Sequence, residues 1–324
     1  MFLSNSLNIP PQLADLVDVQ DQLFERGIDN IGAFLRLSIL DLSSIICYAF
    51  RIRPNSAELY IKTILEIYLN IQDQERFRIA LGRLSIKTIP AISRHLYNKG
   101  FLIWSEISDF IKYQSNEEAM MCYFDIKPLC CNEKTLSIYE SEYNYNKDNH
   151  IALNECIEYG FPIGTIEFNL KYDLIDEMGS FLVSTNVSDS KAKWNPFEWS
   201  FPPRSYDFLS VCAHFGSINC FRILLLNGCR INGDLFCSSV FGGSCEIINL
   251  VSTYNCSKNG SLLQASRTSR YQIFEWLWNS NLLSDHSEIV SYCIRSFLFL
   301  LCNGYDINTY DDINQQFFIY HFIF

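Results

Sequence analysis

The sequence is poor in Pro and Gly, the two residues that most often interrupt helices and strands. Among its 324 residues there are only 9 Pro and 14 Gly, while 48% are hydrophobic and 15% are aromatic. A chain of this composition can bury a large core, so global disorder is not expected. The first residues also lack a basic stretch followed by a long apolar run, and a secretory signal peptide is therefore not expected.

Positive charge and long apolar runs are also scarce. The formal net charge is −11, and Lys and Arg form no cluster longer than a few residues, which argues against nucleic acid as a partner. The longest apolar runs, such as Ile45–Phe50 and Phe297–Cys302, are much shorter than the ~20 residues of a membrane-spanning helix. No membrane span is expected.

Motifs for phosphate, cofactor and metal binding are missing. Neither G-x-x-x-x-G-K nor G-x-G-x-x-G occurs, and there is no C-x-x-C pair. Cys212, His214 and Cys220 are the one tempting metal-ligand cluster, but a zinc site needs about four converging ligands, and the pattern of apolar residues explains both Cys as core. No cofactor and no metal are expected. The 13 Cys, an odd number, are interpreted as reduced thiols of a cytoplasmic protein.

A thiol enzyme is one alternative that the residue types allow. Cys130 and Cys131 are adjacent, and His150 follows them in the chain. A nucleophilic Cys needs a base within hydrogen-bond reach, and nothing in the sequence orders Cys131 and His150 as such a pair. A catalytic site is therefore not expected.

A repeated pattern of two short helices is the most informative feature of the sequence. In Asp207–Asn232, small residues precede Gly216, which can adopt positive φ and end a helix sharply. A Gly-Ser pair returns at Gly243, 27 residues later. The matching apolar positions of three copies are Cys220, Phe221 and Leu224; Ile247, Ile248 and Val251; and Ile273, Phe274 and Leu277. Such helix pairs cannot bury their apolar faces alone and stack on their neighbours.

The copy Asp207–Asn232 resembles an ankyrin repeat, with Ser210 at the first-helix His and Gly228–Asn232 at the closing Gly-Ala-Asp-x-Asn. The resemblance implies an all-α fold, in which an N-terminal helical region precedes a short, irregular ankyrin-repeat solenoid. Phe197–Trp199 and Ile273–Leu277 further resemble a family of protozoan ankyrin proteins, best known from trichomonads, whose divergent ankyrin domain has no known function. Because the period is shorter than the ~33 residues of ankyrin repeats, short or irregular fingers are expected.

The pattern along the chain indicates several regions. Residues 1–114 are read as the helical region, and the polar segment 115–149 as a linker or mobile segment. Divergent repeats are expected over 150–308, followed by a degenerate apolar tail at 309–324. The expected copies within the array are 165–186, 205–232, 233–258, 259–284 and a partial 290–308, with an aromatic insertion at 188–203. We interpret this insertion as an ordered loop over helix ends, with a partner-docking motif as the alternative.

These features favour a non-catalytic scaffold that binds other proteins through its repeats. The resemblance implies that exposed first-helix positions and the fingers bind the partner. The expected partner-binding residues are Ser210, His214, Arg230, Asn232 and Asp234. The alternative is an adaptor whose N-terminal helices recruit other machinery, such as a ligase or a kinase, while the array selects a substrate.

Overall fold

Helices make up the regular structure of the chain. A computed structural model describes residues 11–108, 122, 151–184, 187, 190–195, 197–201, 203, 205–280 and 294–303. These residues contain no strand, so the all-α prediction is confirmed for them. None of the helices in these ranges has the length and apolar character needed to cross a membrane. The predicted linker 115–149, except Cys122, and the predicted tail 309–324 lie outside the described residues.

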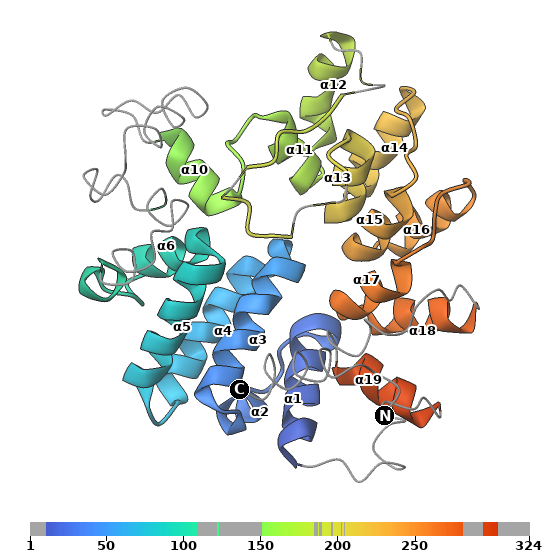
Figure 1. The fold of residues 1–324 in the computed structure, drawn as a ribbon. Helices are drawn as coiled ribbons and strands as arrows, with labels where there is room; N and C mark the ends of the chain where they lie inside the picture. The colour runs from blue at the N-terminus through green and yellow to red at the C-terminus, as the bar shows by residue number, and fades with distance from the viewer. Residues whose placement is uncertain are drawn as a thin grey trace. The chain divides into compact units, whose positions relative to one another are not determined.

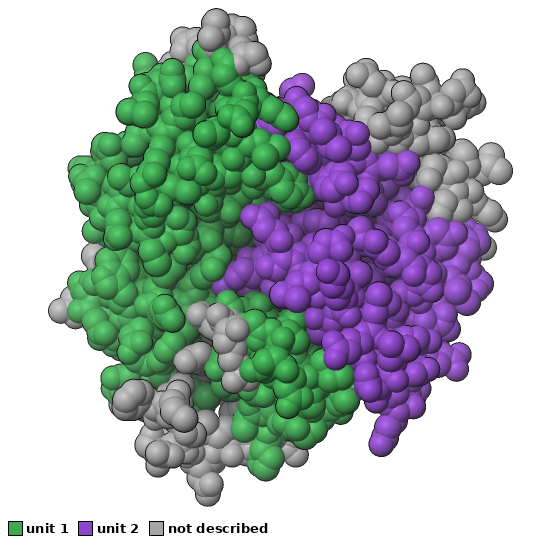
Figure 2. All heavy atoms as spheres, turned by 180° about the vertical axis from the view of Figure 1, so that it is seen from behind, with its two compact units in different colours: residues 1–42, 170–192, 203–324 green, residues 43–169, 193–202 purple. Residues whose placement is uncertain are grey.

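The chain divides into two units that are each built from separated segments (Figure 2). One unit comprises residues 1–42, 170–192 and 203–324, and the other comprises residues 43–169 and 193–202. This division differs from the expected boundary between an N-terminal helical region and a repeat array. It places the first 42 residues with the repeats, and it places residues 151–169 with the N-terminal helices.

The unit of residues 43–169 and 193–202 is a group of helices that pack in chain order. Helix α4 (Ala57–Asn70) packs on α5 (Gln74–Thr88), α5 on α6 (Pro90–Asn98), and α6 on α10 (Ile151–Tyr159). Its core contains edge-to-face aromatic pairs, such as Phe50 with Tyr60 at 5.4 Å between centroids and Tyr68 with Phe101 at 5.2 Å. The unit also contains most of α3 (Ile39–Ile52), from residue 43 onward.

The aromatic insertion covers the end of α3 within this unit. The backbone N of Phe201 donates a hydrogen bond to the carbonyl oxygen of Arg51 at 3.2 Å. The Arg51 guanidinium also lies over the Phe201 ring, 4.2 Å from its centroid. Phe197 and Trp199 are buried. The described part of the insertion is therefore an ordered loop over a helix end, and its buried aromatic side chains do not form an exposed docking motif.

The other unit contains a series of helix pairs (Figure 1). It begins with α1 (Pro11–Asp21), which packs on α2 (Gly32–Arg36). The pairs then follow one another along the chain. The first pair begins at residue 166, and its residues 166–169 are assigned to the other unit. The pairs are α11 (Ile166–Tyr172) with α12 (Ile175–Ser184), α13 (Phe208–Phe215) with α14 (Ile218–Leu226), α15 (Leu235–Gly242) with α16 (Cys245–Ser252), and α17 (Ser261–Arg267) with α18 (Tyr271–Asn279), followed by α19 (Ile294–Cys302).

Each of these four pairs turns through one residue in a left-handed conformation. The φ angles are 58° at Asp173, 77° at Gly216, 74° at Gly243 and 51° at Ser269. Glycine adopts this geometry without a steric penalty, whereas a residue with a Cβ does so at a cost. The same turn geometry therefore recurs even where the sequence does not supply Gly.

The helix pairs stack so that like helices meet. Among the first helices, α13 packs on α15 and α15 packs on α17; among the second helices, α12 packs on α14 and α14 packs on α16. The backbones of α13 and α15 approach closely at Gly242, where an added Cβ would lie 2.0 Å from the carbonyl oxygen of Ala213. Every residue of α13 and of Leu235–Phe241 in α15 is buried. Helices α13 and α15 consequently have no exposed face.

The segments between pairs contain no strand in residues 227–234 and 253–260. They contact each other through the backbone N of Ser257, which donates to the carbonyl oxygen of Gly233 at 3.1 Å. The thiol of Cys237 donates to the carbonyl oxygen of Asn259 at 3.1 Å. These two loops, called the finger loops below, are irregular, as the short period of the sequence predicts.

Candidate functional site

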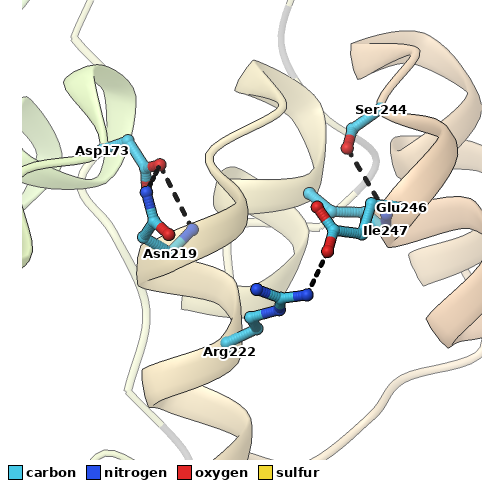
Figure 3. Close-up of polar contacts among 6 residues, drawn as sticks. All are labelled: Asp173, Asn219, Arg222, Ser244, Glu246 and Ile247. Carbon is cyan, nitrogen blue, oxygen red and sulfur yellow. Dashed lines mark hydrogen bonds and ion pairs between the residues drawn. The ribbon is translucent and has the colours of Figure 1, made fainter.

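Polar side chains link successive helix pairs near the starts of the second helices (Figure 3). The carboxylate of Asp173, in the turn before α12, accepts a hydrogen bond from the backbone N of Asn219 at 3.2 Å. It accepts another from the backbone N of Cys220 at 2.7 Å. It also accepts from Asn219 Nδ2 at 2.8 Å. A helix start has unsatisfied N–H groups, so Asp173 acts as a cap for α14 that is supplied by the preceding pair.

The next link is more exposed. Arg222 on α14 forms an ion pair with Glu246 on α16, and both side chains are about half exposed. An ion pair in such a position contributes about 1 kcal/mol at most. Ser244 caps α16, because its Oγ accepts a hydrogen bond from the backbone N of Ile247 at 3.4 Å. Capping and packing, more than charge, therefore hold the second helices in register.

The expectation that Ser210 and His214 form an exposed surface is wrong. Ser210 is 0% exposed and His214 is 3% exposed. The His214 ring stacks on the ring of Phe241 in α15, with 3.9 Å between centroids. The physical reason is that α13 is buried along its whole length, so its polar positions face other residues of the protein.

Asn232 belongs to a structural cluster at the start of α13. Its Nδ2 donates to Ser210 Oγ at 2.9 Å and to the carboxylate of Asp207. Asp207 also accepts from the backbone N of Ser210 at 2.9 Å and from Ser205 Oγ at 2.7 Å. The cluster anchors the first finger loop to the first turn of α13. The sequence placed Ser210 at the position of the first-helix His, but it did not reveal that Asp207 and Ser210 form these hydrogen bonds.

Arg230 and Asp234 are the predicted residues that remain exposed. Both lie in the finger loop 227–234, on either side of the anchored Asn232. The backbone N of Asp234 donates to Asn232 Oδ1 at 2.7 Å, which fixes the second half of this loop. The finger loop 227–234, which hydrogen bonds of Asn232 hold in place, therefore exposes one positive and one negative side chain. It contacts the other finger loop, 253–260, through the hydrogen bond from Ser257 to Gly233.

The thiols near α13 and α14 are buried. Burial raises the pKa of Cys220 to about 12, that of Cys229 to about 11, and that of Cys212 well above its ordinary value. The thiolate is the reactive form, so these three are weak nucleophiles and weak metal ligands at neutral pH. Across the described residues, no three side chains of metal-ligand type come together. Cys131 and His150 lie outside the described residues.

A groove lies between α16 and α18, the second helices of neighbouring pairs. It has a volume of about 400 Å³, and both helices and the turns before them line it. Trp276 on its edge is 44% exposed. Sequence reasoning missed this feature, although a signal exists: Trp276 lies outside the apolar positions Ile273, Phe274 and Leu277 that the repeat pattern requires.

Comparisons with protein-family models, with curated proteins and with solved structures gave no match. The function is therefore inferred from the chain's own residues and their geometry.

Proposed function

We propose that this protein is a non-catalytic scaffold that binds other proteins through a short array of ankyrin-like repeats. The observation that carries the proposal is the repeated helix pair, with first helices packed on first helices and second helices packed on second helices. A stacked array of this kind offers an extended surface for binding. Such binding requires no reactive side chain.

Two local features support the ankyrin-like interpretation. The recurrent left-handed turn residues keep each pair tightly folded, and the absence of a side chain at Gly242 allows α13 and α15 to approach closely. Asp207, Ser210 and Asn232 stand at the positions that ankyrin repeats use to tie the first helix to the finger. Here a carboxylate, a hydroxyl and an amide make those ties.

The binding surface comprises the finger loops rather than the first helices. Because α13 and α15 are buried, a partner has access to the loop residues and to the exposed positions of the second helices. Arg230 and Asp234 provide opposite charges from one loop whose middle is anchored. Preorganised loops lose less conformational entropy on binding, which favours affinity.

Affinity capture with the purified full chain tests this proposal. The variant Arg230→Ala/Asp234→Ala removes both finger charges, and Lys62→Ala/Glu66→Ala removes one charge of each sign from exposed positions of α4. We expect the finger variant to lose specific proteins that the wild type and the α4 variant retain. Identical sets of captured proteins for the wild type and the finger variant would contradict the proposed surface.

A second candidate function is the adaptor. It is favoured by the existence of a separate helical unit with its own aromatic core and by Leu69 on α4, which is 73% exposed. In an adaptor, some captured proteins depend on that unit. Leu69→Ser, or the α4 charge variant, would then lose a subset of proteins that the finger variant retains. If neither α4 change removes any protein, this alternative is excluded.

A further inference from the structure

Helix α4 (Figure 1) has one face in the core of its unit and one face open to solvent. The core face includes Ile61, Ile64 and Ile67, which are at most 2% exposed. The exposed residues of the helix are Glu58, Leu59, Lys62, Glu66, Leu69 and Asn70. The four from Leu59 to Leu69 are spaced by three, four and three residues. This spacing forms the stripe through which one helix packs along another.

The stripe is apolar at its ends and charged in its middle. Leu59 is 45% exposed and Leu69 is 73% exposed. Neither Lys62 nor Glu66 forms an ion pair with a residue in the part of the chain that the structure describes. They lie four residues apart on one helix, but with Lys on the N-terminal side, which is the weaker order for a pair within a helix. The stripe therefore offers two leucines and two opposite charges to a partner.

The order of residues in the stripe is symmetric about Ile64. Leu59 lies five residues before Ile64, and Leu69 lies five residues after it. Lys62 lies two residues before it, and Glu66 lies two residues after it. When two copies of α4 lie antiparallel about a two-fold axis at this point, leucine faces leucine and each Lys62 faces a Glu66. A parallel pair would instead bring like charges together, which is unfavourable. The stripe is thus complementary to itself, as a two-fold interface requires.

We propose that the exposed face of α4 binds the same face of a second copy of this chain, as an antiparallel pair of helices related by a two-fold axis. Leu59 of each copy packs on Leu69 of the other copy. Lys62 of each copy forms an ion pair with Glu66 of the other copy. This self-association goes beyond the proposed scaffold function, because α4 and the finger loops belong to different units.

The proposed interface is short. Glu58 and Asn70, six residues before and after Ile64, are its outermost residues, and they place a carboxylate opposite an amide donor at each end. This stretch of helix is about 20 Å long, so the contact should bury less than the ~1,200–2,000 Å² of stable interfaces. The net charge of −11 on each copy also opposes association. We therefore expect a reversible dimer, with a dissociation constant on the order of 100 μM.

Sedimentation velocity of the purified full chain, from about 5 to about 500 μM, measures this association. We expect the weight-average sedimentation coefficient of the wild type to rise with concentration toward that of a dimer. Lys62→Glu makes both central positions acidic and Glu66→Lys makes both basic, so each variant alone should bind itself at least about tenfold more weakly. An equimolar mixture of the two variants should associate with the wild-type affinity, because each Lys again faces a Glu.

Two further variants control for net charge and for folding. Lys87→Glu makes the same charge change at an exposed position of α5, in the same unit, and should associate like the wild type. The exchanged chain Lys62→Glu/Glu66→Lys should also regain the wild-type affinity. Because all of these positions are exposed, the circular dichroism spectra and melting temperatures of the variants should match those of the wild type.

Three results would overturn the proposal. They are a wild type that sediments as a monomer at every concentration, self-association that Lys62→Glu leaves unchanged, and a mixture of Lys62→Glu with Glu66→Lys that stays monomeric while the wild type dimerises. A monomeric wild type whose variant Lys62→Ala/Glu66→Ala loses captured proteins would instead assign this face to another protein, as in the adaptor. Loss of self-association alone should leave the proteins that the finger loops bind in place, since those loops belong to the other unit.

Discussion

Substitution of Gly242 tests the stacking of helix pairs most sharply. Gly242 is the last residue of α15, and a Cβ built there would lie 2.0 Å from the carbonyl oxygen of Ala213 and 3.0 Å from the backbone N of Gly216. Both neighbours are backbone atoms, so no side chain can rotate away. In Gly242→Ala the two helix pairs must separate or distort.

The magnitude follows from two opposing effects. Replacing Gly by Ala within a helix stabilises it by about 0.5–1 kcal/mol. Overpacking a close contact costs about 1–3 kcal/mol, and contact with rigid backbone puts this substitution at the upper end. We expect Gly242→Ala to lose about 2 kcal/mol of unfolding free energy overall.

Gly179 provides a matched control. It lies inside α12, is exposed, and a Cβ there would meet no atom within 4 Å. Gly179→Ala should therefore gain about 0.5–1 kcal/mol, because only the helix-propensity effect remains. Urea unfolding followed by circular dichroism measures both variants against the wild type. A Gly242→Ala protein as stable as Gly179→Ala would refute the close approach of α13 and α15.

Further predictions concern the cap, a buried His and the thiols. Asp173→Ala should cost about 1 kcal/mol in the same urea titration because α14 loses its cap, and Asp173→Asn should cost less; equal stability of Asp173→Ala and the wild type would contradict the capping role. Burial, with a smaller effect of Lys99, lowers the pKa of His95 below its ordinary 6.5. The unfolded state then binds more protons, so the contribution of His95 to stability is full above about pH 6.5 and is lost as the pH falls through the folded-state pKa. His95→Gln should show a smaller drop in the urea midpoint between about pH 7.5 and about pH 5 than the wild type, and an equal drop would count against burial of the neutral form. Iodoacetamide should alkylate the exposed Cys245 much faster than the buried Cys212 in site-resolved mass spectrometry; similar rates would show that α13 is accessible.

The helix pairs were predictable from the sequence for a physical reason. Gly216 and Gly243 supply left-handed turns, and the apolar residues after them recur at fixed offsets. Asp173 and Ser269 adopt the same turn geometry, but positive φ is uncommon in residues with a Cβ, so sequence alone could not place these turns. The assignment of residues 1–42 to the unit of the repeats also depends on contacts distant in sequence.

The candidate surface was only partly predictable. Arg230 and Asp234 are charged residues in a turn-rich segment, and exposure is the ordinary outcome for such residues. Ser210 and His214 are polar residues on a first helix, where exposure or burial depends on what packs against that helix. No local pattern encodes this. Trp276 lies outside the apolar positions of the repeat pattern, and in the structure it is 44% exposed and lines the groove between α16 and α18.

Proximity labelling in the native cell tests the central claim most directly. A labelling enzyme is fused to the wild type, to Arg230→Ala/Asp234→Ala and to Lys62→Ala/Glu66→Ala, and the labelled proteins are quantified at matched expression. We expect a defined set of neighbours for the wild type, of which the finger variant loses a part that the α4 variant retains. Labelled sets that are the same for all three proteins would contradict a scaffold that binds partners through the finger loops.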